Sequence, residues 1–394
     1  MTDQAGAPAD GSGPPSAPAE PRIHRGLKDV YFDRSGVSSI DGRAGELRYR
    51  GYSIHDLAER ASFEEVCALL LYGELPNRTQ LAALDAELKA ARQIPDEVRA
   101  LIATIRHAHP MEVLRTAVSA LGAGRADPTD VSTPALLREG LRLTAQVPTI
   151  IAFHHRLRSG LAPVEPSTEL AHGANFLYML HGTAPGAEAA RIMDVDLVLH
   201  AEHGSNASSF AARVVAGTGA GPYAALTAAI GALSGPAHGG AAEDVMKMVR
   251  EIGDPANAAA WVKAKRAKRE PIMGFGHRVY RAEDPRARHL RDRAERLSRE
   301  RGQPQWFAVL QAVVAAMQPY ARLGVNVNVD FYAGVIYHLL GIPQDCFVPI
   351  FAMGRVPGWV TQVREQAENN ILIRPLTLYD GPPARGWVPI EARG

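Results

Sequence analysis

Four short segments in the second half of the chain carry residue types that can catalyse reactions. They read Leu199-His-Ala-Glu-His-Gly-Ser-Asn206, Ser234-Gly-Pro-Ala-His-Gly-Gly240, Ile272-Met-Gly-Phe-Gly-His-Arg-Val-Tyr-Arg281 and Asn326-Val-Asn-Val-Asp330. Glycine lets the backbone come close to a ligand, and binding groups concentrate in loops held by a rigid scaffold. The sequence therefore predicts a polar site at helix ends and glycine-rich joints.

The second segment places His238 at a predicted helix N-terminus, between Pro236 and the pair Gly239 and Gly240. The helix dipole disfavours an imidazolium there, so the ring should be neutral. A neutral histidine can donate a hydrogen bond to a developing enolate. The alternative for one isolated histidine is a side chain that only satisfies the start of the helix.

The third and fourth segments are ambiguous when each is taken alone. Gly274 and Gly276 flank the approach to His277, but no clear strand precedes this Gly-x-Gly, so it is not a dinucleotide-binding loop. Asp330 precedes a helix predicted over 331–340 and could cap that helix or act as a general base. Asp284 followed by Pro285 could likewise be a helix N-cap with proline in the first turn.

Composition excludes several classes of function. The 394 residues include 43 basic and 42 acidic side chains, and this +1 balance gives no bulk electrostatic case for nucleic acid or an anionic membrane. No P-loop and no His-Glu-x-x-His pair occurs, so neither ATP nor metal machinery is predicted. Cys67 and Cys346 lie too far apart for a CxxC motif, and we expect buried thiols in a reducing, cytoplasmic setting. The chain opens without a basic stretch and an apolar run, so no secretory signal is expected.

The elements that must position these segments are predicted to be helices almost throughout. We expect a disordered tail over residues 1–21 and one or two short strands between Arg22 and Ile54, at 30–33 and 46–50. Ser62 and Glu65 form a capping box for a helix that Gly73 ends. Further helices are predicted near 79–92, 97–107, 111–121, 134–158, 168–180, 187–200, 206–216, 223–233, 240–251, 258–269, 285–301, 305–318, 331–340 and 357–369. Glycines and prolines break the uncharged stretch 214–242, so no membrane span is expected. The fold class is therefore all-α, without a βαβ rhythm.

In this order and spacing, the motifs together resemble the citrate synthase family over residues 22–394. The other matching stretches are Gly51-Tyr-Ser-Ile54, Asp284-Pro-Arg286, Arg355-Val-Pro-Gly-Trp359 and Ile373-Arg-Pro375. One departure is Gly204, where family members often have an acidic residue. The resemblance implies a helical homodimer with a large multi-helix domain (22–233 and 330–394), a smaller helical domain (234–329) and a short N-terminal β segment.

The resemblance also implies a reaction, the condensation of acetyl-CoA with oxaloacetate followed by hydrolysis to citrate and CoA. Acetyl-CoA would be a substrate, and no cofactor or metal is implied. The implied catalytic residues are His238, His277 and Asp330. The implied oxaloacetate ligands are His203, Arg286, Arg355 and Arg374, the last from the other subunit. The implied CoA contacts are Gly274, Phe275, Gly276, Arg281 and Asn328.

Two other functions compete with this one. A 2-methylcitrate synthase would use propionyl-CoA on the same fold, and Arg278 after His277 weakly favours citrate. A catalytically silent acyl-CoA or metabolite sensor would need the arginines but not the base. The presence of His238, His277 and Asp330 together argues against that sensor.

Overall fold

The structure of the protein is a computed structural model that describes residues 21–27, 30–125, 127 and 130–394. These residues fall into two units. One comprises 35–373, and the other combines 21–34 with 374–394. The terminal unit holds two short 3₁₀ helices, η1 (Arg25–Leu27) and η4 (Ile390–Ala392). The predicted disordered tail over 1–21 lies outside the described residues except for Pro21.

The β segment is a three-stranded antiparallel sheet in the order β1-β2-β3. Its strands are β1 (Ser38–Asp41), β2 (Glu46–Tyr49) and β3 (Tyr52–Ser53), and Ser38 pairs with Tyr49. The strand predicted over 46–50 is confirmed. The strand predicted over 30–33 is wrong, because the first strand is 38–41, which contains only one apolar residue and has no alternating pattern to reveal it.

Ten helices precede the second polar segment of the chain. Their capping signals are local: Ser62 Oγ accepts the Glu65 N–H at 3.2 Å, the Glu65 carboxylate accepts the Ser62 N–H at 2.7 Å, and Gly73 ends the helix with φ 97°. The capping box and the glycine end are thus confirmed. The ten are α1 (Ile54–Arg60), α2 (Phe63–Tyr72), α3 (Arg78–Ala90), α4 (Asp96–Thr104), α5 (Pro110–Ala123), α6 (Thr133–Arg158), α7 (His172–His181), α8 (Ala187–His200), α9 (Ala207–Ala216) and α10 (Pro222–Leu233).

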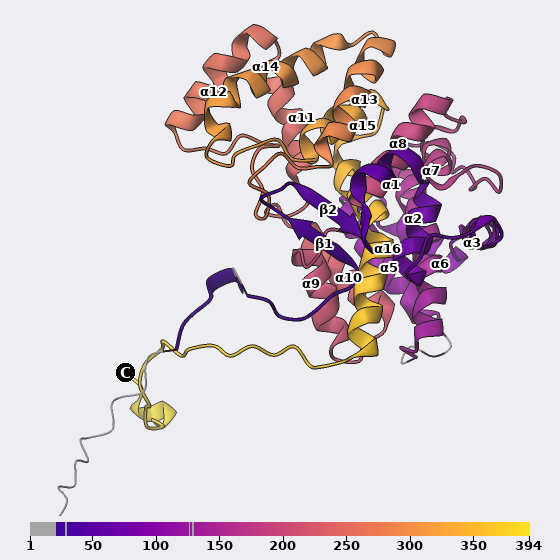
Figure 1. Ribbon diagram of the computed structural model, residues 1–394. Coiled ribbons are helices and arrows are strands. Elements are labelled where there is room, and N and C mark those ends of the chain that lie inside the picture. The colour runs from indigo at the N-terminus through magenta and orange to yellow at the C-terminus, as the bar shows by residue number, and fades with distance from the viewer. Residues whose placement is uncertain (1–20, 28–29, 126, 128–129) are drawn as a thin grey trace, which may run out of the picture. The chain divides into compact units, whose positions relative to one another are not determined.

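A second group of helices follows and packs mainly on itself (Figure 1). It consists of α11 (Ala241–Ile252), the 3₁₀ helix η2 (Pro255–Asn257), α12 (Ala258–Ala267), α13 (Ala287–Glu300), α14 (Pro304–Ala321) and α15 (Asp330–Leu339). After η3 (Gln344–Cys346), the helix α16 (Phe347–Glu368) returns to the first group and contacts α6, α8, α9 and α10. A domain division at 234 and 330 remains a prediction.

Two helices differ from the sequence-based expectation. Helix α1 was not predicted, because its seven residues are too few to display a helical period. Helix α16 begins at Phe347, ten residues before the predicted start, and contains Pro357 in its interior. Proline in a helix interior removes a hydrogen bond and usually ends the helix. Here almost the whole helix is buried, and tertiary packing outweighs that local cost.

The described residues contain sixteen α-helices and three short strands, so the all-α fold class is confirmed. Within the described part of the chain, no helix is long and apolar enough to cross a bilayer. Cys67 and Cys346 are free and buried, as expected, and burial raises the pKa of both thiols.

Candidate active site

The Gly-Phe-Gly loop and the Asn-Val-Asn segment are paired through their backbones. The Gly276 N–H donates to Asn326 O at 2.8 Å, and the Asn328 N–H donates to Gly274 O at 2.9 Å. Both glycines have positive φ, +78° at Gly274 and +85° at Gly276. A Cβ at Gly274 would lie 2.5 Å from the Phe331 ring, whereas a Cβ at Gly276 would meet nothing within 4 Å. Gly274 is thus needed for packing, and Gly276 leaves open space beside the backbone.

Asp284 and Arg286 form a buried bidentate ion pair next to this loop. Arg286 Nε lies 2.9 Å from Asp284 Oδ1, and Nη2 lies 2.7 Å from Oδ2. Burial alone would raise the pKa of the Asp284 carboxyl, but the Arg286 charge and hydrogen bonds lower it overall. Asp284 does not cap α13, whose N-cap position is Arg286 and has no side-chain cap bond. The carboxylate instead holds the guanidinium, leaving Nη1 with no partner among the described residues.

His277 is held as a neutral ring with a defined tautomer. Its Nδ1 accepts hydrogen bonds from the backbone N–H groups of Val279 at 3.0 Å and Tyr280 at 3.2 Å. A backbone N–H can only donate, so Nδ1 is unprotonated and the proton sits on Nε2. Burial, helped by the Arg286 charge, lowers the pKa of His277 to about 4. At neutral pH this side chain therefore offers one N–H donor, at Nε2.

The turn that carries His277 is fixed against the β1–β2 turn. The Arg281 N–H donates to Gly42 O at 2.7 Å. A Cβ at Gly42 would lie 2.3 Å from Val279 O, so no side chain is tolerated at this contact without movement. The Arg281 guanidinium folds back onto the His277 carbonyl at 3.1 Å and is exposed. The N-terminal sheet thus helps to set the position of the His277 turn.

His203 lies just beyond α8 and faces the same turn. Its ring centroid is 5.1 Å from that of His277, and its Nε2 is 3.1 Å from the Tyr280 hydroxyl oxygen. Burial lowers the pKa of His203 well below its usual range, and the charges of Arg286 and Arg355 act in the same direction. His203 is therefore also neutral.

The residues around His203 explain why position 204 holds a glycine instead of an acidic residue. Gly204 has φ +59°, and its N–H donates to Glu202 Oε1 at 2.6 Å. The same carboxylate oxygen accepts from Ser38 Oγ at 3.1 Å and from Gln362 Nε2 at 3.0 Å. A left-handed backbone favours glycine over an acidic residue. Buried Glu202 therefore supplies the anchoring of this loop.

Arg355 is the second buried arginine of the site. It is 1% exposed, its Nε donates to the His200 carbonyl, and its guanidinium lies 4.6 Å from the centroid of the Phe351 ring. Burial lowers its pKa to about 10, and nearby Glu202 partly offsets that shift. Within the described ranges, no residue accepts a hydrogen bond from its Nη1 or Nη2. The charge is thus desolvated and available to an anion.

His238 contacts a serine that the sequence did not single out. The Ser208 N–H donates to His238 Nε2 at 3.2 Å, and the Ser208 Oγ lies 2.9 Å from the same nitrogen. The Trp359 Nε1–H donates to that Oγ at 3.1 Å. The proton of the neutral His238 ring must therefore sit on Nδ1. His238 lies three residues before Ala241, the first residue of α11, which agrees with its predicted position at the start of a helix over 240–251. Burial, then Arg355, lowers the pKa of His238 to about 4, so the helix dipole is not the main cause.

Asp330 is the first residue of α15 and does not cap it. The N-cap position is Val329, and no side-chain cap bond is present. Burial raises the pKa of Asp330, while the charge of Arg286 opposes that shift. The capping alternative for Asp330 is thus not what the structure shows.

The structure brings together most of the predicted site residues. The rings of His203 and His277 are in contact, and the charge of Arg286 lowers the pKa of both. Phe351 links Arg355 to His238, whose ring centroid is 6.4 Å from that of Phe351. Arg374 belongs to the terminal unit, so its role stays a prediction. Sequence reasoning missed Tyr280, Ser208, Trp359, Asp284 and Glu202 as supporting residues. For four of these residues the available signal was a polar or aromatic side chain inside a motif that already held a predicted site residue, whereas Ser208 lies two positions beyond its motif.

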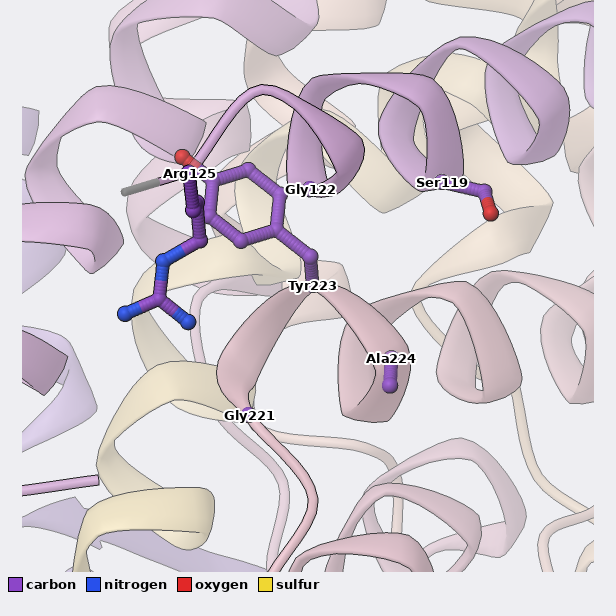
Figure 2. Close-up of a pocket in the computed structure, with 6 residues that line it drawn as sticks. All are labelled: Ser119, Gly122, Arg125, Gly221, Tyr223 and Ala224. Atoms are coloured by element: carbon purple, nitrogen blue, oxygen red, sulfur yellow. The ribbon is translucent and has the colours of Figure 1, made fainter. Parts of the chain in front are cut away.

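A separate hollow lies between α5 and α10 (Figure 2). Its lining comprises Ser119, Gly122, Arg125, Gly221, Tyr223 and Ala224. None of the predicted site residues contributes to it. Among the described residues, no group of three or more histidine, cysteine or acidic side chains is arranged to hold a metal ion.

Comparison with known proteins gives one consistent family. The family model described as "Citrate synthase, C-terminal domain" matches residues 26–376. Citrate synthase 2 of Bacillus subtilis is 43% identical over 94% of this chain and 99% of its own, and a 2-methylcitrate synthase of Mycobacterium tuberculosis is 42% identical over 94% of each. The crystal structure of citrate synthase from Pyrobaculum aerophilum aligns with a TM-score of 0.90 at 39% identity, covering 99% of this chain and 100% of that one. Citrate synthase of Thermoplasma acidophilum, in a ternary complex with carboxymethyl coenzyme A and oxaloacetate, aligns with a TM-score of 0.90 at 30% identity, covering 94% of this chain and 100% of that one. The chain belongs to the citrate synthase family.

Proposed function

We propose that the protein is a citrate synthase, an acyltransferase that condenses acetyl-CoA with oxaloacetate and hydrolyses the product to citrate and CoA. One observation carries the proposal. Two buried guanidinium groups, Arg286 and Arg355, lie beside neutral histidines with assigned N–H donors and near an aspartate of raised pKa. That combination suits a small dianion that must receive a carbon nucleophile made by proton removal.

Oxaloacetate would be held by Arg286 and Arg355 through its carboxylates. Arginine matches a carboxylate with two parallel N–H groups, and such charge-assisted bonds are the stronger ones. The Nε2–H of His277 would donate to the ketone oxygen and stabilise the alkoxide formed there. His203 would add a donor, and Arg374 would come from the partner subunit.

Asp330 and His238 would generate the nucleophile. The Asp330 carboxylate would remove a proton from the acetyl methyl group, while the Nδ1–H of His238 donates to the thioester oxygen. Because the pKa of His238 is about 4, the ring stays neutral and acts as a hydrogen-bond donor at neutral pH. The raised pKa of Asp330 makes its carboxylate a stronger base than an exposed one.

The remaining assignments follow the same family pattern. CoA would lie along the Gly274–Gly276 loop, with Phe275, Arg281 and Asn328 in contact, and the open space beside Gly276 supports that placement. We also propose a cytoplasmic homodimer with shared active sites, a small domain over 234–329, and no resident cofactor or metal.

A second candidate is a 2-methylcitrate synthase, favoured by the 42% identity to the Mycobacterium tuberculosis relative of that name. Thiol release measured with acetyl-CoA and with propionyl-CoA, each with and without oxaloacetate, tests both. Preference for acetyl-CoA in kcat/KM, dependent on oxaloacetate, supports a citrate synthase. Preference for propionyl-CoA supports the second candidate. Acyl-CoA binding without any thiol release would overturn both and return the protein to the sensor class.

A further inference from the structure

The hydroxyl of Tyr280 is buried against a single partner. The side chain is 1% exposed, and its oxygen lies 3.1 Å from His203 Nε2. Its ring stacks at a tilt on His277, with 4.7 Å between centroids, and meets His203 edge to face at 5.5 Å. No other described residue is within hydrogen-bonding distance of this hydroxyl.

This geometry decides where the protons lie. A phenol in this site stays protonated, because burial raises its pKa. Its one proton needs an acceptor, and His203 Nε2 is the acceptor within reach. If His203 carried its proton on Nε2, that N–H would point at the phenol oxygen and the buried phenol proton would have no partner, which is costly. The paired arrangement is therefore Tyr280 O–H donating to an unprotonated Nε2, with the His203 proton on Nδ1.

The other ring nitrogen then becomes the useful one. His203 Nδ1 accepts or donates no hydrogen bond to a described residue, and the charges that act most on the ring are those of Arg286, His277 and Arg355. The Nδ1–H is thus a donor left over in the part of the site that holds both buried arginines.

We propose that Tyr280 is a positioning residue, which fixes His203 as the Nδ1–H tautomer so that this N–H donates to the bound 2-oxo diacid. The inference rests on the proposed function for its substrate, but the tautomer itself is a property of the ligand-free protein. Tyr280 acts through His203 and does not touch the reacting atoms.

The test is Tyr280→Phe, which removes the hydroxyl and keeps the ring that packs on His277. We expect kcat/KM for oxaloacetate to fall about tenfold, the size of one lost buried hydrogen bond, chiefly through KM. The KM for acetyl-CoA should change less than about twofold. The matched control is Tyr223→Phe, which removes a buried hydroxyl bonded to Glu139 at 2.8 Å and should leave both constants unchanged.

Two further measurements separate positioning from direct binding or general damage. In a His203→Ala background, Tyr280→Phe should lower kcat/KM for oxaloacetate little further, because the partner of the Tyr280 hydroxyl is already gone. Nitrogen-15 spectra of the histidine-labelled, ligand-free protein should show His203 protonated at Nδ1, with mixed tautomers in Tyr280→Phe. An Nε2–H tautomer in the wild type, or an undiminished tenfold loss in the His203→Ala background, would overturn the proposal. If the wild type releases no thiol at all, the proposed function fails while the tautomer result still stands or falls by itself.

Discussion

Replacing Asp330 by asparagine should separate rate from stability. The Asp330 carboxylate makes no helix-capping bond, because the N-cap residue of α15 is Val329 and no side chain caps this helix. Burial raises the pKa of Asp330, so the fold disfavours its ionised form relative to the unfolded chain. Asparagine has nearly the same shape and no charge. The variant should therefore be at least as stable as the wild type at neutral pH.

Asp330→Asn should strongly lower the catalytic rate, although it should not lower stability. Loss of a positioned general base typically lowers the rate by a factor on the order of 10² to 10⁴, or about 3 to 5 kcal/mol in the barrier. The amide cannot take a proton from the acetyl methyl group, whereas Arg286 and Arg355 remain to bind the dianion. Turnover should fall by that factor while oxaloacetate binding stays within about threefold.

Three assays measure this: thiol release, calorimetry with oxaloacetate, and exchange of the methyl protons of an acetyl-CoA analogue with deuterium. The control is Asp254→Asn, because Asp254 is exposed and its carboxylate accepts the Ala256 N–H at 2.8 Å, a role that asparagine can fill. Its activity and stability should stay unchanged. Near-normal turnover in Asp330→Asn would show that this residue is not the base. A marked drop in melting temperature would show instead that its charge stabilises the fold.

Three other predictions concern the supports of the site. Ser208→Ala should lower kcat several-fold, because the backbone N–H still holds His238 Nε2. It should lower the free energy of unfolding by about 1 to 3 kcal/mol, because the contacts of the hydroxyl with His238, Trp359 and Asn206 are lost. A thousandfold loss in thiol release would contradict this. Gly42→Ala should raise the KM for oxaloacetate, since its Cβ would overlap Val279 O and displace the His277 turn; an unchanged KM would mean that the sheet does not set that turn. The free energy of unfolding should also decrease as the pH is lowered from about 6.5 to 4. His238 and His277 have folded pKa values of about 4 and unfolded values near 6.5, so the unfolded chain binds more protons in that window. Their contribution is complete above pH 6.5 and is lost toward pH 4, by at most about 1.4 kcal/mol per pH unit for each histidine. Urea unfolding at several pH values, with His277→Gln to remove one histidine from the slope, measures this.

Local signals in the sequence were sufficient for most helices but not for all. The box at Ser62 and the glycine at 73 act within one turn, so both ends of α2 could be predicted. Helix α1 starts at a similar cap, where Ser53 Oγ accepts the His55 N–H at 3.2 Å, but it is too short to show a period. The early start of α16 could not be predicted, because burial against other helices outweighs the local cost of Pro357.

For the site, residue types and motif spacing predicted the groups that could react, and the supporting contacts stayed hidden. Ser208 and His238 are 30 positions apart, and Asp284 accepts the Val329 N–H across 45 positions. Such contacts depend on how the helices fold back on one another, which no single segment encodes. The motifs predicted the reactive side chains because each motif contains them within one short segment of the sequence.

The tautomers of His238 and His277 depend on backbone contacts of this kind, one of them long-range and the other local. His238 receives a backbone N–H at Nε2 and His277 receives two at Nδ1, so the two rings are held in opposite tautomers. Backbone donors cannot be removed by changing a side chain, so each tautomer is fixed by the path of the chain itself. The helix dipole, which the sequence suggested as the cause of a neutral His238, is not needed once a fixed donor faces the ring. Each histidine must therefore offer its substrate a different nitrogen, Nδ1 at His238 and Nε2 at His277, and a mechanism that requires the reverse pair is incompatible with this backbone.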